Sequence, residues 1–359
     1  MLNGSDIDWP DRYARQTKFA PIGAQGQRNL EQSCVLIVGC GALGASLAQH
    51  MVRAGAQEVR IVDRDFVEPS NLQRQTLFDE ADAIAAVPKA IAAAAKLKKI
   101  NSMVRIDAHV ADVNSYTVWN FVNGVDLVLD GTDNTATRLL LSDVCYELNI
   151  PFAYGGVAGA KGMSALLVPG KTACLRCMIG DEDSAVEGDT CSTVGVLSAA
   201  VEFVASLQMV EALKWLSGNR EAVRRSWVSA DIWQFSIREL QLPEPLPQCE
   251  HCGVNAGNKT SSINKSKKAR FGLESSVVLC GRDSIQVTLP QSIELDSIHY
   301  KLEGMGCVMT VNRYLVKAKI GSGETLVLFP DGRVLVQGVT EASRAIELCE
   351  HYLLGELIS

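Results

Sequence analysis

The chain has 359 residues, enough for about two domains, and its 47% hydrophobic and 21% charged residues indicate a folded globular protein. Its 41 acidic and 34 basic side chains give a net charge of −7, so it lacks the positive field that sequence-independent nucleic-acid binding requires. The first residues contain no apolar core of the signal-peptide type, and the most apolar stretch, residues 196–216, carries Glu202, Glu211 and Lys214. We therefore expect a cytoplasmic protein that neither spans a membrane nor binds nucleic acid.

Short β-branched segments alternate with longer alanine- and leucine-rich segments in the first half of the chain. The expected strands are residues 34–39, 58–63, 104–110, 126–131 and 151–157, and the expected helices are residues 45–54, 88–99, 116–122 and 135–148. Strands that are apolar throughout and are separated by helices indicate a Rossmann-like, doubly wound α/β fold with a mainly parallel sheet. Strand-like residues 162–168 and 227–240 flank the long apolar helix and predict an antiparallel extension of the sheet.

The composition changes after Gly253. Residues 254–270 are polar and basic and have no apolar period, so we interpret them as a linker between residues 1–253 and 271–359. The expected strands of the smaller domain lie within residues 277–289, 314–320, 325–330 and 333–338, and its expected helices are residues 297–302 and 340–354. The sequence thus predicts a small C-terminal α+β domain, whose role it leaves open.

A glycine-rich turn, Gly39-Cys-Gly41-Ala-Leu-Gly44, joins the first expected strand to the first expected helix. Without Cβ atoms the backbone can turn tightly and approach a polyphosphate, whose charge the N-terminus of the helix stabilises. Asp63 ends the next strand, where its carboxylate can accept hydrogen bonds from ribose hydroxyls. The pattern predicts a nucleotide site, although alone it fits NAD or FAD as well as ATP, or a turn required only for packing.

Three polar residues further along favour ATP over a dinucleotide. Arg74 and Lys89 offer positive charge to a triphosphate, and Asp133 follows a strand at a position where it could hold Mg²⁺. Taken alone, each of the two cations also fits a solvated surface position.

The chain contains two Cys-x-x-Cys pairs, Cys174/Cys177 and Cys249/Cys252, which lie 72 residues or more apart in the sequence. Two such turns can close on one tetrahedral Zn²⁺, and four thiolate ligands leave no open position, so the metal would be structural. The alternative is a redox motif, but a redox Cys-x-x-Cys normally stands alone at the N-terminus of a helix. The spacing therefore predicts a zinc site.

The motifs RYARQ, GCGALG, DRDFVEPSNLQRQ, VPK, DGTDN, CLRC, TCSTVGV and CEHCG occur in this order between Arg12 and Gly253. Over these two thirds of the chain, the sequence resembles the ThiF/MoeB/HesA family of adenylating enzymes, relatives of the ubiquitin-activating enzymes. The resemblance implies ATP- and Mg²⁺-dependent adenylation of a small ubiquitin-like sulfur carrier of the ThiS or MoaD type that ends in Gly-Gly. Sulfur transfer in thiamine, molybdopterin or tRNA chemistry then yields a thiocarboxylate, and the resemblance also implies a homodimer.

The resemblance assigns roles to individual residues. The implied nucleotide-binding set is Gly39, Gly41, Gly44, Asp63, Asp65, Asn71, Arg74, Gln75, Lys89, Asp133 and Asn134. Asp63 would hold the ribose, whereas Asn71, Arg74 and Lys89 would hold the phosphates. Asp133 would lie beside the metal, and Arg15 would reach into the partner's ATP site. The chain departs from the family pattern at Ala42, where many relatives have glycine, and its C-terminal domain is not a rhodanese domain.

Cys191 lies in a polar, glycine-containing segment just ahead of a helix, and a helix N-terminus favours the thiolate form of a nearby cysteine. Some relatives link this cysteine to the carrier or use it to relay sulfur from a persulfide donor, whereas others do not require it, so both interpretations stay open. The five cysteines in or near apolar segments are expected to be packing residues: Cys34, Cys40, Cys145, Cys307 and Cys349.

Two other functions remain open at this point. Adenylating enzymes that modify a ribosomal peptide precursor share the same ATP site, and a nucleotide-binding module with a Rossmann fold need not adenylate anything. Carrier-dependent pyrophosphate exchange separates these functions.

Overall fold

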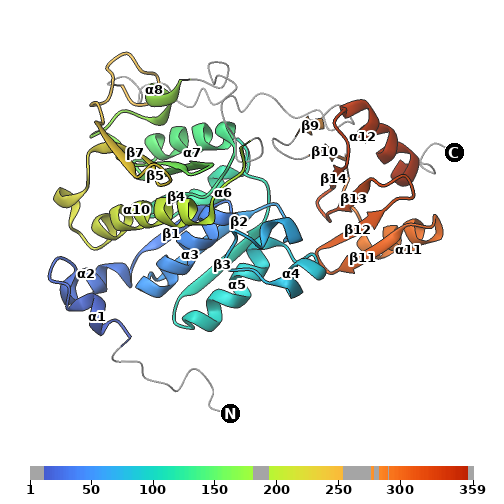
Figure 1. Ribbon diagram of the computed structural model, residues 1–359, viewed down its shortest axis with the longest axis horizontal. Coiled ribbons are helices and arrows are strands. Elements are labelled where there is room, and N and C mark those ends of the chain that lie inside the picture. Colours follow the sequence, from blue (N-terminus) through green and yellow to red (C-terminus); the bar gives the residue numbers. More distant parts are fainter. Residues whose placement is uncertain (1–11, 181–193, 254–275, 279–282, 290, 355–359) are drawn as a thin grey trace, which may run out of the picture. The chain divides into compact units, whose positions relative to one another are not determined.

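The computed structural model describes residues 12–180, 194–253, 276–278, 283–289 and 291–354 (Figure 1). Contacts within the chain divide it into two units, of which the first comprises residues 1–80 and 88–263. The second unit comprises residues 264–359 together with the short segment Ala81–Val87. The expected linker, residues 254–270, lies outside the described residues. No described helix combines the length and the apolar composition needed to cross a bilayer.

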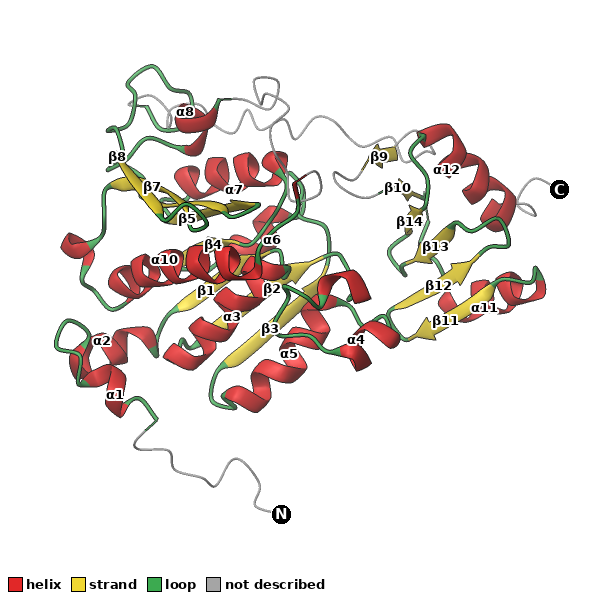
Figure 2. Ribbon diagram, in the orientation of Figure 1, coloured by secondary structure: helices red, strands yellow, loops and turns green. Residues whose placement is uncertain are grey.

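An eight-stranded sheet forms the centre of the first unit (Figure 2). Its strands are β1 (Cys34–Val38), β2 (Glu58–Asp63), β3 (Arg105–Val110), β4 (Leu127–Asp130), β5 (Phe152–Ala158), β6 (Lys161–Leu167), β7 (Ser226–Asp231) and β8 (Ser236–Gln241). Their order in the sheet is β3-β2-β1-β4-β5-β6-β7-β8; the pairs from β3 to β5 are parallel and the pairs from β5 to β8 are antiparallel. This confirms the predicted α/β fold class, a mainly parallel sheet with an antiparallel extension.

The expected strand at residues 227–240 is in fact a hairpin of two strands, β7 and β8. The carboxylate of Asp231 accepts hydrogen bonds from the backbone N–H groups of Trp233 and Gln234, both at 3.0 Å. An aspartate that bonds the amides two and three residues ahead stabilises a turn, so β7 ends there. The apolar residues on both sides of the turn conceal this break in a pattern-based prediction.

Helices cover both faces of this sheet (Figures 1 and 2). The described helices of the first unit are α1 (Ala14–Thr17), α2 (Gly23–Leu30), α3 (Ala42–Ala54), the 3₁₀ turn Pro69–Asn71, α5 (Lys89–Ile100), α6 (Val118–Val122), α7 (Thr135–Glu147), α8 (Leu175–Ile179), α10 (Ser198–Leu216) and the 3₁₀ turn Arg220–Ala222. Helix α4 (Glu80–Ile84) begins at the last residue before Ala81–Val87, the segment that belongs to the second unit. Leu36 and Val38 of β1 pack with Leu139 of α7. Because side chains alternate along a strand, Val35 and Ile37 face the opposite layer, where α3 and α10 pack together.

A six-stranded antiparallel sheet forms the second unit. Its elements are β9 (Ser276–Val278), β10 (Ser284–Thr288), α11 (Leu295–Gly304), β11 (Val308–Asn312), β12 (Leu315–Lys319), β13 (Thr325–Leu328), β14 (Arg333–Gln337), α12 (Ala342–Cys349) and a π-helical turn, Glu350–Leu354. The strand order is β11-β12-β13-β14-β10-β9. Leu302 of α11 and Leu348 of α12 lie in one core with the buried side chains of the strands, so both helices pack on the sheet.

Candidate active site and metal centre

The turn between β1 and α3 is built from glycines that lie close together. Gly39 has a φ of +82°, a conformation that favours glycine, and a Cβ there would lie 2.7 Å from the carbonyl oxygen of Gly131. A Cβ on Gly44 would collide with the carbonyl oxygen of Gly39, and one on Gly131 would lie 2.5 Å from the same oxygen. The end of β1, the start of α3 and the end of β4 therefore meet at distances that only glycine allows.

Gly41 has a different environment from these packed glycines. It is the N-cap of α3, and the nearest side-chain atom to a Cβ there would be Nε2 of Gln75, at 3.8 Å. The N-terminus of the thirteen-residue helix α3 therefore opens onto space that a phosphate group can enter, with backbone N–H groups directed at it. This cradle fits a nucleotide.

Asp63, at the end of β2, ties this turn to its neighbours. Its two carboxylate oxygens accept hydrogen bonds from the backbone N–H groups of Cys40 and Asp65, both at 2.6 Å. Burial raises the pKa of Asp63, while the positive charge of Lys89 and the two amide donors act in the opposite direction. The carboxylate fixes the backbone where the expected ribose would lie.

Lys89 is a buried cation at the first residue of α5. The Lys89 side chain is 4% exposed, and its Nζ lies 3.0 Å from the carboxylate Oδ2 of Asp65. The backbone N–H of Lys89 also donates to the backbone carbonyl oxygen of Asp65, at 2.9 Å. Lysine is almost never buried without a partner, so its position here, close to the end of β2, is not that of a solvated surface residue.

The segment that follows β2 carries three further residues of the expected nucleotide-binding set. Asn71 is 1% exposed, and its Oδ1 accepts the backbone N–H of Glu68 at 3.2 Å. Gln75 is 3% exposed, and within the described residues its buried Oε1 has no hydrogen-bond partner, which leaves it available to a ligand or to water. Arg74 is half-buried and donates from Nη1 to the carbonyl oxygen of Ser70 at 2.9 Å.

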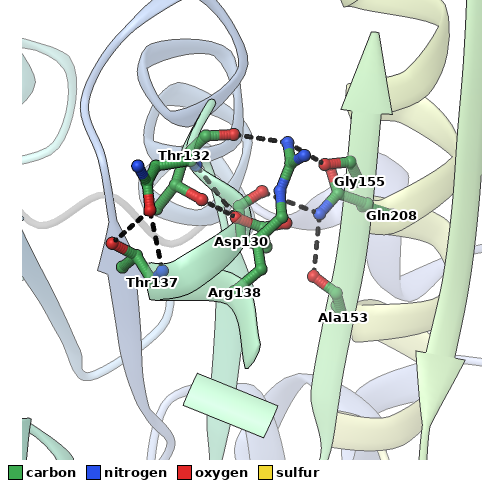
Figure 3. A network of polar contacts seen from close by, with 8 residues as sticks. Asp130, Thr132, Thr137, Arg138, Ala153, Gly155 and Gln208 are labelled. Carbon is green, nitrogen blue, oxygen red and sulfur yellow. Dashed lines mark hydrogen bonds and ion pairs between the residues drawn. The ribbon is translucent and has the colours of Figure 1, made fainter. Parts of the chain in front are cut away.

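A buried polar network joins the end of β4 to the first half of β5 (Figure 3). Asp130 is fully buried, and its Oδ2 accepts a hydrogen bond from Nε of Arg138 at 2.9 Å, while its Oδ1 accepts from the backbone N–H and the hydroxyl of Thr132. Arg138 also donates from Nη2 to the carbonyl oxygens of Thr132 and Gly155. Burial raises the pKa of Asp130, and the charge of Arg138 acts against that rise.

Gln208 of α10 extends the network from the opposite face of the sheet. Its Nε2 donates to the carbonyl oxygens of Asp130 and Ala153, at 3.1 and 2.9 Å (Figure 3). Sequence reasoning missed Arg138 and Gln208. The one available signal was the position of Arg138 four residues after Asn134, on the face of a helix that follows the DGTDN motif.

Asp133 and Asn134 lie between this network and the first turn of α7. Asp133 is exposed, whereas Asn134 is the N-cap of α7, and its Oδ1 accepts the backbone N–H of Thr137 at 2.9 Å. The turns after β1, β2 and β4 lie at one edge of the parallel sheet, where ligands bind in open α/β folds.

Arg15 lies at the opposite end of α3 from the glycine turn. The adjacent Gln16 donates from Nε2 to the carbonyl oxygen of Ala54, the last residue of α3, at 3.0 Å. At 1.5 Å per residue, the thirteen residues of α3 span roughly 20 Å. The structure therefore brings together the expected nucleotide-binding residues of β1, β2 and β4 but not the exposed Arg15, and Cys191 lies outside the described residues.

The four cysteines of the two Cys-x-x-Cys pairs converge, and none of them forms a disulfide. The Sγ atom of Cys174 lies 3.8 Å from that of Cys177 and 3.7 Å from that of Cys249, and Cys177 lies 3.7 Å from Cys252. A tetrahedral zinc ion with Zn–S bonds of about 2.3 Å requires sulfur atoms about 3.8 Å apart. The cluster therefore fits zinc binding.

The thiols of the cluster differ in how readily they ionise. Burial raises the pKa of Cys174 and raises that of Cys177 to about 12, whereas at Cys249 burial is outweighed by hydrogen bonds from the backbone N–H groups of Cys252 and His251, which lower the pKa. Thiolates at Cys174 and Cys177 would therefore need a compensating positive charge. Asp143 of α7 supports both turns: it accepts hydrogen bonds from Nε and Nη2 of Arg176 at 2.8–3.0 Å and lies 3.1 Å from Nδ1 of His251.

The ThiF family model matches residues 13–251. The chain is 37% identical over 338 residues to the sulfur carrier protein ThiS adenylyltransferase of Bacillus subtilis strain 168, covering 93% of this chain and 96% of that protein. It is 33% identical over 274 residues to the SAMP-activating enzyme E1 of Haloferax volcanii, covering 76% of this chain and 100% of that protein. The crystal structure of E. coli MccB with ATP matches the fold with a TM-score of 0.58, at 23% identity over 67% of this chain and 74% of that chain. The chain belongs to the ThiF family.

Proposed function

We propose that this protein is an adenylyltransferase that uses ATP to activate the C-terminal carboxylate of a small ubiquitin-like sulfur carrier ending in Gly-Gly. The observation that carries the proposal is the similarity over nearly the whole length of both chains to a protein named for its action on the sulfur carrier ThiS. The glycine turn and the buried Lys89 beside the end of β2 support it.

The chemistry accounts for the residue types at the site. An oxygen of the carrier carboxylate attacks the α-phosphorus of ATP, the bond to pyrophosphate breaks, and an acyl-adenylate forms. Because both reactants are anions, the reaction needs positive charge and N–H donors that are already in place. The N-terminus of α3 at Gly41 and the desolvated ammonium of Lys89 supply them, and the low local dielectric strengthens their effect.

The remaining residues complete the proposed nucleotide site. We assign Asp63 to the ribose, and Asn71, Arg74 and Gln75 to the region of the phosphates. Mg²⁺ held by Asp133 would screen the negative charge of the triphosphate.

We further propose that the protein acts as a homodimer in which Arg15 serves the partner's ATP site. The length of α3 separates Arg15 from the glycine turn of its own chain, and the side chain is exposed. Both observations support a role for Arg15 across an interface rather than within one chain.

After adenylation, we propose that a persulfide partner supplies the sulfur. Its terminal sulfur displaces AMP from the acyl-adenylate to form an acyl disulfide, and a second thiol releases the carrier thiocarboxylate by forming a disulfide with the donor. Cys191 is our candidate for that second thiol or for the persulfide itself. We also propose a cytoplasmic setting for this chemistry, where thiols stay reduced.

We assign Zn²⁺ to Cys174, Cys177, Cys249 and Cys252. The sulfur separations support tetrahedral coordination with no open position, so the ion would be structural.

Carrier-dependent exchange of labelled pyrophosphate into ATP tests the proposed function. Arg74→Ala and Asp133→Ala should each lower exchange on the order of 10²-fold or more while the circular dichroism spectrum stays unchanged. The matched control is the same carrier without its terminal Gly-Gly, which should support no exchange. Exchange supported only by a short peptide would favour a peptide-modifying enzyme, and no exchange with ATP bound would favour a non-catalytic module.

A further inference from the structure

The segment Ala81–Val87 belongs by its contacts to the second unit, although residues on both sides of it belong to the first. The chain thus enters and leaves the second unit within seven residues, and Lys89 follows two residues later. What fixes this segment therefore also sets the path of the chain into Lys89.

A helix C-cap of unusual composition ends the segment. Ala86 is 2% exposed and has a φ of +46°, its N–H donates to the carbonyl oxygen of Ala83, and the N–H of Val87 donates to that of Asp82. These two bonds form the Schellman motif, which normally places glycine in the left-handed position. A residue with a Cβ holds this conformation only where its surroundings impose it.

Asn312 supplies the surroundings that this turn requires. Its Nδ2 donates to the carbonyl oxygens of Ala85 and Ala86, at 2.9 and 3.2 Å, which are groups that the end of a helix leaves without an intrahelical partner. Its Oδ1 accepts the backbone N–H groups of Tyr314 and Leu315, at 2.9 and 3.0 Å, and so closes the turn between β11 and β12. The nitrogen of the Asn312 amide therefore caps the turn at Ala85 and Ala86, whereas its oxygen closes the β11–β12 turn.

The chain after this turn has little freedom before it reaches Lys89. Pro88 has a fixed φ and forms an isolated β-bridge with Phe66, and the backbone N–H of Lys89 donates to the carbonyl oxygen of Asp65. A shift of Ala86 is therefore passed to the bridge at Pro88 and to the lysine that follows it.

We propose that Asn312 is a positioning residue for Lys89, and that the β11–β12 hairpin of the C-terminal unit holds the turn that presents this lysine to ATP. The proposal rests on the assignment of Lys89 to the phosphates. It gives the C-terminal unit a part in adenylation that the ATP-binding motifs alone do not reveal.

Asn312→Asp tests the proposal selectively. The aspartate keeps the acceptor for Tyr314 and Leu315, but it removes the donor to Ala85 and Ala86 and places negative charge against their carbonyl oxygens. Loss of the two hydrogen bonds that hold this turn, one at the exposed Ala85 and one at the buried Ala86, should accelerate amide hydrogen exchange in peptides covering residues 83–90 about tenfold and raise the KM for ATP by about the same factor. The control Arg313→Gln changes the net charge equally in the same turn and should change neither quantity.

Ala86→Gly provides a rescue in the Asn312→Asp background. Glycine adopts the left-handed conformation without the penalty that alanine carries, so the double variant should recover part of the lost ATP affinity and protection. A variant with unchanged hydrogen exchange in residues 83–90, or faster exchange with an unchanged KM, would overturn the proposal, as would a double variant without recovery. Hydrogen exchange needs no catalysis, so a wild-type protein inactive with every carrier would instead refute the proposed function.

Discussion

Replacement of Arg138 by methionine tests whether the buried network at the end of β4 stabilises the first unit. The substitution keeps an apolar stem but removes the donors to Asp130, to Thr132 and to the carbonyl oxygen of Gly155. The carboxylate of Asp130 is fully buried and would lose its cationic partner, whose own side chain is 15% exposed.

The burial of the two charged side chains determines how much Arg138→Met should lower the free energy of unfolding. Removal of one partner from a buried ion pair costs about 3–5 kcal/mol, and because Arg138 is partly exposed we expect about 3 kcal/mol of unfolding free energy. For a unit of this size, that loss lowers the Tm by roughly 6 to 12 °C. A matched variant, Asp130→Asn with Arg138→Met, carries no buried charge at this site and should be about 1 kcal/mol more stable than Arg138→Met alone.

The pH dependence gives an independent signature. Burial already raises the pKa of Asp130 above 3.8, and without Arg138 it should rise further. A carboxyl group whose pKa is higher in the folded state binds its proton more tightly there, so stability falls as the pH rises from the unfolded towards the folded pKa. Arg138→Met should therefore lie closer to the wild type in stability at pH 5 than at pH 8.

Urea unfolding followed by circular dichroism at both pH values measures these differences. If Arg138→Met were within about 0.5 kcal/mol of the wild type, or the double variant were no more stable than Arg138→Met, the network would not carry the stability assigned to it.

Three further predictions concern the metal, the dimer and the sulfur step. Cys252→Ser should lose zinc and thermal stability together, because metal binding is coupled to folding, whereas Cys145→Ser should retain the metal; elemental analysis of folded wild-type protein without zinc would contradict the assignment. Arg15→Ala and Asp133→Ala should each be inactive, but mixed chains should regain exchange through one intact site per mixed dimer, and no recovery after full subunit exchange would exclude the arrangement. Cys191→Ser should leave pyrophosphate exchange unchanged and slow thiocarboxylate formation, measured from the mass of the carrier; an unchanged rate would make the cysteine a bystander.

Local patterns were sufficient to predict the central features of the first unit. The glycine turn and Asp63 follow two consecutive apolar strands, and parallel neighbours bring such strand ends to one edge of a sheet. The Cys-x-x-Cys pairs carry their geometry in their spacing, so their convergence could be predicted although 75 residues separate Cys174 from Cys249.

Residues whose roles depend on distant partners could not be predicted in the same way. Gln208 is a polar residue within an apolar helix, and its amide donates hydrogen bonds to carbonyl oxygens 78 and 55 residues away in the chain. Local patterns assign no role to Asn312, because only its acceptor acts locally and its donor reaches Ala85, 227 residues away. No periodicity or motif connects such pairs, since their contacts arise only when the chain is folded.

The course of α7 links the metal centre to the nucleotide site. Its first turn carries Arg138, which bonds Asp130 at the end of β4, and about one and a half turns later Asp143 accepts hydrogen bonds from Arg176 and contacts His251. Arg176 lies within the first Cys-x-x-Cys turn and His251 within the second, so one carboxylate attaches both halves of the metal centre to this helix. A metal that holds the two halves together would therefore also restrain α7, and with it the turn that carries Asp133. We therefore predict that a metal bound there would contribute to ATP binding through the rigidity of α7: folded Cys252→Ser protein should bind ATP more weakly in isothermal titration calorimetry, and an unchanged Kd would contradict the link.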